Sequence, residues 1–129
     1  MLRHLVPPTI RPPFARYSHA VEISAGARLL LVSGQLGISV EDVIPESVEA
    51  QAALCFAAIA ACLGEAGMAR EDIVRLNAYV TDRAHLPGYM AARDRFIADP
   101  PPASTLMIVS GFARPEFKVE IEALASRVD

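Results

Sequence analysis

The sequence predicts an α+β domain of two layers, in which a mixed β-sheet is covered on one face by two helices. Three observations predict this fold class. Residues 117–123, FKVEIEA, alternate strictly between apolar and polar side chains, which is the period of a half-buried strand. Residues 52–63 contain no charged side chain, as in a helix that is packed on more than one side. Strand and helix patterns alternate along a chain of 129 residues, a length that suits one domain.

The composition limits the classes of partner. Hydrophobic residues make up 53% of the chain, the net charge is −3 and the 12 basic residues are scattered, so nucleic acid is not an expected partner. No apolar run approaches the roughly 18 residues that a membrane span needs, and the N-terminus lacks the apolar core of a signal peptide. We therefore expect a cytoplasmic protein that does not bind membranes and buries its surplus apolar surface between subunits.

The two cysteines are predicted to fill the core. Cys55 and Cys62 lie on one predicted helix with their Cα atoms about 10 Å apart, which is too far for a disulfide. No group of cysteine and histidine residues has the spacing of metal ligands, so we expect no structural metal.

The N-terminal third is predicted to contain an arm and a hairpin. Residues 1–16 carry prolines 7, 8, 12 and 13, which predict an extended, irregular arm. Strands are predicted at 18–24 and 28–35, joined by a tight turn in which Gly26 can adopt a positive φ. The apolar run Leu29 to Val32 predicts that the second strand is buried on both faces.

Two helices flank a third strand in the middle of the chain. Ser47 is the predicted N-cap of a helix that runs to about Leu63 and ends at Gly64 or Gly67. Because this helix lacks a polar stripe, we expect it to pack on the sheet and also on another helix or subunit. The third strand is predicted at 73–82, with Val74, Leu76, Ala78 and Val80 on one face and Arg75, Asn77 and Tyr79 on the other.

The second helix is predicted from Leu86 to about Ala98, and the prolines that follow it end it. Residues 104–110, STLMIVS, are apolar at successive positions and are predicted to form a strand beside 117–123, covered on both faces. On the polar face of 117–123, Glu120 and Glu122 lie two residues apart. A carboxylate on this strand is the first candidate for chemistry.

The residues alone do not name a reaction. The sequence has no phosphate-binding glycine-rich loop, no HExxH zinc motif and no GxSxG nucleophile elbow. The polar positions of interest are Tyr17, Ser33 to Gln35, and Glu120. Alternating glutamates are common on exposed strands, so a solvated Glu120 is the alternative, and we expect Glu122 to be solvated.

Short motifs of the chain resemble those of the Rid family, the YjgF-like reactive intermediate deaminases. The motifs are YSHA at 17–20, VSGQ at 32–35, DIVRLNAYVTD at 72–82, PPAST at 101–105 and VEIEA at 119–123. The resemblance covers nearly the whole chain from about residue 15. It implies a single domain over 1–129, a ferredoxin-like fold similar to chorismate mutase, and a homotrimer with clefts between subunits. It also implies that no metal or organic cofactor is used.

Active members of the Rid family hydrolyse small imines and enamines, such as 2-aminoacrylate, to 2-keto acids and ammonia. The resemblance gives Glu120 the role of positioning and activating the attacking water. It places Tyr17, Ser33, Gly34 and Thr105 in the pocket that holds the small-molecule substrate.

The chain departs from the family where the deaminases carry a carboxylate-gripping arginine. Those proteins read Pro-Ala-Arg followed by Ser or Thr, and alignment on Ser104-Thr105 puts Ala103 at the arginine position. We therefore expect little activity toward 2-aminoacrylate. Arg114, in a connection longer than that of the deaminases, is the nearest replacement cation. Met90, where many members have asparagine, predicts a more apolar pocket.

Three functions remain open. The first is a hydrolytic deaminase that acts on the C–N bond of a small imine or enamine, which the retained Glu120 favours. The second is a trimer without catalytic activity that binds a small molecule or another protein. The third is a ribonuclease or translation inhibitor, which the acidic balance of charge and the absence of a basic groove disfavour.

Overall fold

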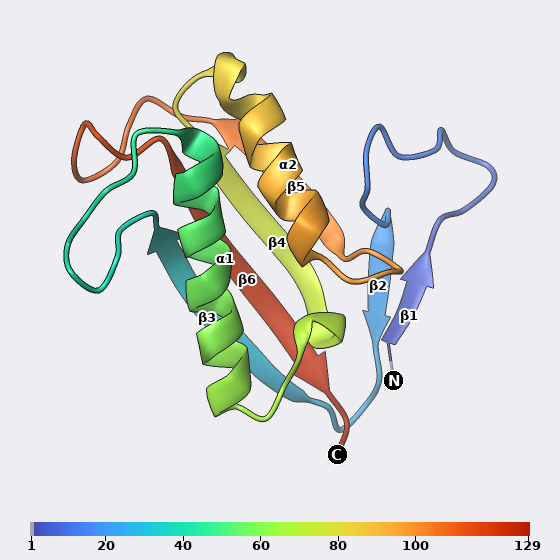
Figure 1. Ribbon diagram of the computed structural model, residues 1–129. Coiled ribbons are helices and arrows are strands. Elements are labelled where there is room, and N and C mark those ends of the chain that lie inside the picture. Colours follow the sequence, from blue (N-terminus) through green and yellow to red (C-terminus); the bar gives the residue numbers. More distant parts are fainter. Residues whose placement is uncertain (1) are drawn as a thin grey trace.

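The computed structural model describes residues 2–129 (Figure 1). The strands and helices, in chain order, are β1 (Leu2–Leu5), β2 (Ala20–Ile23), β3 (Arg28–Leu36), α1 (Val48–Glu65), β4 (Ile73–Val80), α2 (Leu86–Phe96), β5 (Ala103–Ile108) and β6 (Val119–Arg127). Two 3-10 turns, Arg70–Asp72 and Arg83–His85, precede β4 and α2.

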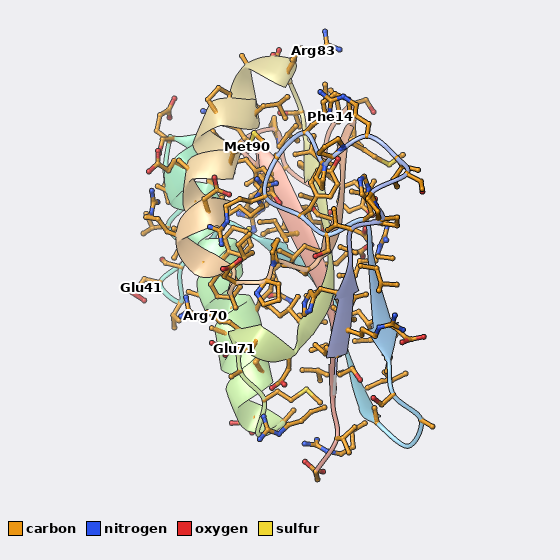
Figure 2. The ribbon with its side chains drawn as sticks, turned by 90° about the vertical axis from the view of Figure 1, so that its right-hand side faces the viewer. Phe14, Glu41, Arg70, Glu71, Arg83 and Met90 are labelled. Carbon is orange, nitrogen blue, oxygen red and sulfur yellow. The ribbon has the colours of Figure 1, made fainter. Side chains whose placement is uncertain are left out.

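The main sheet has the strand order β3-β6-β4-β5. Its β4–β5 pair is parallel, and its other two pairs are antiparallel. Both long helices lie on one face of this mixed sheet, and we call the other face the open face (Figures 1 and 2). The predicted fold class, with two helices on one face of a mixed sheet, is confirmed.

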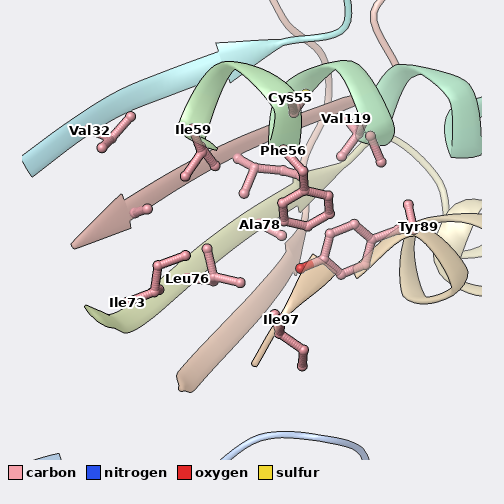
Figure 3. Packing of buried hydrophobic residues seen from close by; sticks show 14 of the residues in the cluster. Val32, Cys55, Phe56, Ile59, Ile73, Leu76, Ala78, Tyr89, Ile97 and Val119 are labelled. Carbon is pink, nitrogen blue, oxygen red and sulfur yellow. The ribbon is translucent and has the colours of Figure 1, made fainter. Parts of the chain in front are cut away.

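The alternation in β6 and β4 decides which side chains form the core. Val119 and Ile121 of β6 and Leu76 and Ala78 of β4 are fully buried under the helices, in the cluster of Figure 3. Glu120, between two of them, is directed to the open face because successive side chains of a strand leave opposite faces. The predicted inward and outward sets of both strands are confirmed.

Helix α1 begins after the predicted N-cap Ser47 and runs to Glu65, two residues beyond the predicted Leu63. The Ser47 hydroxyl accepts a hydrogen bond from the Ala50 amide at 3.1 Å, and Gly67 follows the helix with a φ of +68°. The buried side of α1 packs on the sheet, and α2 lies beside it; the two helices meet where Phe56 stacks on Tyr89 with ring centroids 6.2 Å apart. Cys55 is fully buried and Cys62 half-buried, and both are free thiols.

The length of α1 corrects one expectation. With 18 residues it is long and apolar enough to cross a membrane by length and composition, although no apolar run of this kind was expected. Core helices meet the same two criteria. In this fold, one side of α1 forms the centre of the core through Ala52, Cys55, Phe56, Ile59 and Leu63.

The predicted hairpin at residues 25–27 is wrong. Strand β2 pairs with β1 rather than with β3, in a separate two-stranded ribbon whose outer side carries the Arg3–Glu22 ion pair of 3.0 Å. Gly26, with a φ of +78°, turns the chain without bringing β2 and β3 into register. Leu2–Leu5 are extended, as predicted for the arm, but they are regular rather than irregular, because they form β1 and satisfy the backbone hydrogen bonds of β2.

Two strands, β3 and β5, were predicted to be covered on both faces, and for a single chain both predictions are wrong. Strand β5 is an edge strand separated from β6 by β4, and Leu29 and Leu31 of β3 and Met107 of β5 are 57%, 76% and 55% exposed. The physical reason is that the helices cover only one face of the sheet. Leu30 and Val32, whose side chains leave the other face of β3, are the ones that pack on the core.

Candidate functional site

Glu120 lies in an open pocket of about 380 Å³ at the end of the sheet where β6 begins. This Glu120 pocket is lined by Gly34, Tyr79, Val109, Gly111, Phe112, Glu120 and Glu122. The register of β3 on β6 shifts between Val32 and Gln35, which brings the Gly34 backbone against the Glu120 side chain. A Cβ at Gly34 would lie 2.4 Å from Glu120 Oε2. Glycine is therefore what allows the carboxylate to lie against β3.

The two carboxylates of the Glu120 pocket have different surroundings. Glu122 Oε1 accepts hydrogen bonds from Asn77 Nδ2 at 3.1 Å and from Tyr79 Oη at 2.8 Å, and the carboxylate raises the pKa of the Tyr79 hydroxyl. Glu122 is therefore part of a hydrogen-bond network, and the expectation that its side chain is simply solvated is wrong. Among residues 2–129, no hydrogen bond or ion pair involves the half-buried Glu120 carboxylate. Glu120 is the carboxylate that is available to a water molecule or ligand.

Cys55 lies near Glu120 but is not a candidate nucleophile. Its Sγ donates a hydrogen bond to the Gln35 carbonyl oxygen at 3.1 Å. Burial, and to a smaller extent the negative charge of Glu120, raise the pKa of the Cys55 thiol to about 12. At neutral pH Cys55 is therefore a protonated, inert thiol.

A row of polar side chains continues from Glu122 across the open face to Thr105. Arg75 Nε donates to Asn77 Oδ1 at 2.9 Å, and Arg75 Nη2 donates to Thr105 Oγ1 at 2.7 Å. Thr105, a predicted pocket residue, is exposed on β5 and does not line the Glu120 pocket. The sequence reasoning missed Arg75 and Asn77 as site neighbours, although the alternation of 73–82 already put them on one face with Tyr79.

A second pocket lies on the helix-covered side of β5, between the N-terminal arm and α2. This arm pocket has a volume of about 350 Å³ and is lined by Phe14, Ala15, Tyr17, Leu86, Met90, Arg93, Ser104 and Leu106. Figure 2 labels Phe14 on the arm and Met90 on α2. The structure brings Tyr17 and Met90 together here, and away from Glu120. Ser104 lines the arm pocket, whereas its neighbour Ala103 does not.

Hydrogen bonds fix the arm over this pocket. The Ser18 amide donates to the Pro102 carbonyl at 3.0 Å, and the Ser18 hydroxyl donates to the Pro101 carbonyl at 2.6 Å. Arg16 Nη1 donates to the Asp94 carbonyl oxygen at 2.9 Å. Tyr17, between these two anchors, is therefore held against β5 and α2.

Like Thr105, two further predicted site residues line neither pocket. Ser33 is exposed on β3, where its carbonyl oxygen accepts a hydrogen bond from the Gln35 side chain at 3.0 Å. Arg114 is exposed, with its guanidinium carbon 6.0 Å from the centre of the Phe117 ring. Of the predicted set, only Glu120 and Gly34 meet in one pocket of the single chain.

The comparisons with known proteins agree with this fold. The family model described as endoribonuclease L-PSP matches residues 9–127. A RutC family protein of Aquifex aeolicus (strain VF5) is 37% identical over 82 residues, which are 63% of this chain and 63% of that protein. The match therefore spans less than two thirds of the length of this relative.

Solved structures of similar proteins align over almost the whole chain. YyfB of Yersinia pestis, from the conserved Rid protein family, is 31% identical with a TM-score of 0.82, covering 96% of this chain and 97% of that chain. RidA from the Antarctic bacterium Psychrobacter sp. PAMC 21119 is 26% identical with a TM-score of 0.71, covering 95% and 98%. The predicted resemblance to the Rid family is confirmed.

Proposed function

This chain belongs to the endoribonuclease L-PSP (YjgF/Rid) family, and we propose that it is a hydrolytic deaminase of a small imine or enamine. The observation that carries the proposal is the Glu120 carboxylate, half-buried in an open pocket against Gly34 and without a protein partner among residues 2–129. A carboxylate in this setting can hold a water molecule and accept its proton.

The proposed reaction needs one such group. Glu120 accepts a proton from water while the water oxygen forms a bond to the imine carbon, and the π-electron pair of the C=N bond moves to nitrogen. Glu120 returns this proton to nitrogen, which gives an amino alcohol. The hydroxyl proton of the amino alcohol is then transferred to nitrogen as the C=O bond forms and the C–N bond breaks, which gives a carbonyl compound and ammonia. Protons and electrons balance within the substrate, one water molecule and Glu120, so the residues present suffice for the step.

We propose that the complete site forms between copies of the chain, as in a homotrimer. Two observations support this. The predicted pocket residue Tyr17 and the predicted base Glu120 lie in separate pockets with no lining residue in common. The open face also carries the exposed side chains of Leu29, Leu31 and Met107, which a second copy would cover.

The proposal is tested with the purified wild-type protein and a panel of 2-imino acids released from amino acids by an amino acid oxidase. The loss of imine is followed by trapping with semicarbazide and by ammonia release. We expect faster hydrolysis of at least one imine with an apolar side chain. We expect little pyruvate from freshly generated 2-aminoacrylate, because no arginine occupies position 103 or 104 and the apolar surface of Met90 favours a larger apolar side chain. No acceleration with any imine would favour the alternative of a ligand-binding trimer without catalysis. Rapid pyruvate release would contradict the argument from the missing arginine.

A ribonuclease function has less support. The Glu120 pocket contains two carboxylates and no lining cation, and the net charge of the chain is −3. Both features repel the phosphates of RNA.

Replacing Gly34 with valine is expected to lower the rate of imine hydrolysis by about 10-fold or more, because the new Cβ displaces a catalytic group. The displaced atom is Glu120 Oε2, which would lie 2.4 Å from that Cβ. Gly64→Ala is the matched control, since an added Cβ at Gly64 meets nothing within 4 Å. Steady-state kinetics and circular dichroism of both variants check the prediction. Full activity in Gly34→Val would show that Glu120 can act from another position.

A further inference from the structure

The arm pocket contains a buried cation that has no role in the reaction steps proposed for Glu120. Arg93 of α2 is 5% exposed and lines the pocket together with apolar side chains. Taking a guanidinium out of water is strongly unfavourable unless charged or hydrogen-bonding partners replace the water. The partners of Arg93 are therefore informative about what the pocket is built to hold.

The protein satisfies only part of the Arg93 guanidinium. Its hydrogen bonds to residues 2–129 go to Asp94 Oδ1, from Nε at 3.2 Å and from Nη2 at 3.1 Å. The Asp94 side chain is 44% exposed, so this ion pair lies at the rim of the pocket and is screened by solvent. On the other side, the guanidinium carbon lies 5.9 Å from the centre of the buried Tyr89 ring. The guanidinium also lies close enough to the buried Tyr89 hydroxyl to oppose the rise that burial causes in its pKa. Nη1 makes no hydrogen bond within residues 2–129, so it can donate to a further acceptor.

The rest of the arm pocket complements a small anion with an apolar body. Tyr17 and Ser104 bring hydroxyl groups to the same pocket. Phe14, Met90 and Leu106 supply apolar surface, and the arm is fastened over them through Arg16 and Ser18. A carboxylate oxygen is the natural acceptor for Nη1, because an arginine–carboxylate hydrogen bond is short and charge-assisted.

We propose that Arg93 is the anion-binding residue of the arm pocket, and that its ligand is a small carboxylate with an apolar side chain. The inference rests on the proposed function: the substrate is then the 2-imino acid of an apolar amino acid, and the product is the matching 2-keto acid. The cation comes from α2, beside Ser104 of β5, rather than from β5 itself.

The test measures binding, without turnover, of 4-methyl-2-oxopentanoate to the full chain by isothermal titration calorimetry. Removal of one charge-assisted hydrogen bond is expected to weaken binding to Arg93→Gln by about 10-fold or more. Arg95→Gln is the matched control, because Arg95 is exposed on the same helix and pairs with Glu49. Its affinity is expected to equal that of the wild type. The uncharged ketone 4-methyl-2-pentanone is expected to bind the wild type and Arg93→Gln equally. Equal affinity of Arg93→Gln and wild type for the keto acid would overturn the proposal.

A second measurement covers the case in which Arg93→Gln does not fold. In wild-type protein, keto acid is expected to shift the amide resonances of Tyr17 and Ser104, whereas the ketone leaves the Arg93 side-chain resonance unchanged. Shifts confined to Arg75 and Thr105 on the open face would place the anion elsewhere and overturn the proposal.

The inference and the proposed function can fail separately. If keto acid binds through Arg93 and no imine is hydrolysed, the inference stands and the deaminase proposal fails. If imines are hydrolysed and Arg93→Gln has the KM of the wild type, the deaminase proposal stands and the inference fails.

Discussion

Replacing Glu120 with glutamine is expected to lower kcat for imine hydrolysis by about 100-fold or more, which is the usual contribution of a general base. Glutamine has nearly the same shape but cannot accept a proton from water. Because Glu120 makes no hydrogen bond or ion pair within residues 2–129, its replacement removes no interaction that supports the fold. The measurement is steady-state kinetics on the best imine of the panel, with thermal unfolding of the same samples.

Glu122→Gln is the comparison variant, because Glu122 lies on the same face of β6 in the same pocket. Its carboxylate accepts hydrogen bonds from Asn77 and Tyr79, so the change is expected to act on stability, by about 1 kcal/mol, more than on kcat. Equal losses of kcat in the two variants would mean that the reaction depends on the total negative charge of the pocket and not on one particular carboxylate. In that case Glu120 would not be the base.

The part of the site that could be predicted from the sequence depends on local periodicity. Alternation over 117–123 places Glu120 opposite a buried Val119 and Ile121 whatever the strand order, because the period belongs to the strand itself. The helix ends at Ser47 and Gly67 follow from cap chemistry in the same way. These features could be predicted without knowing which strands are neighbours in the sheet.

The parts of the fold and site that could not be predicted depend on pairing between segments that are distant in the sequence. Residues 104–110 are apolar at successive positions whether their strand lies at the centre or at the edge of the sheet, so the pattern did not reveal that β4 separates β5 from β6. The partners of Glu122 on β4 and the pairing of β2 with β1 are non-local in the same sense. Such contacts leave no periodic signal in either segment.

The arginine that replaces the missing cation could not be predicted from the sequence, again because its position depends on packing between distant segments. Arg114 was the nearest arginine in sequence to the strand that lacks one, yet it lies outside both pockets. Arg93 precedes that strand on a different element, and only the packing of α2 against β5 brings it beside Ser104. A buried arginine on a helix has no sequence signature, because the same residue type is common on exposed helix faces.

Gln51 of α1 connects the core to the segment that carries the Glu120 pocket. Its side chain is fully buried; Nε2 donates to the carbonyls of Pro45 and Glu116, both at 2.9 Å, and Oε1 accepts from the Lys118 amide at 2.8 Å. Val119, the first residue of β6, follows Lys118 directly. One side chain thus anchors the start of the strand that bears Glu120.

Replacing Gln51 with leucine is expected to lower the free energy of unfolding by about 3 kcal/mol, because three backbone groups lose their partner and each costs about 1 kcal/mol or more. Urea denaturation at a fixed protein concentration measures the change, since association between subunits would make the midpoint depend on concentration. Glu65→Gln, an exposed change on the same helix, is the control and is expected to stay within about 0.5 kcal/mol. A loss below about 1 kcal/mol in Gln51→Leu would mean that water replaces these hydrogen bonds at little cost. The start of β6 would then be held by its pairing with β3 and β4 alone, and Glu120 would keep its position without the anchor from α1.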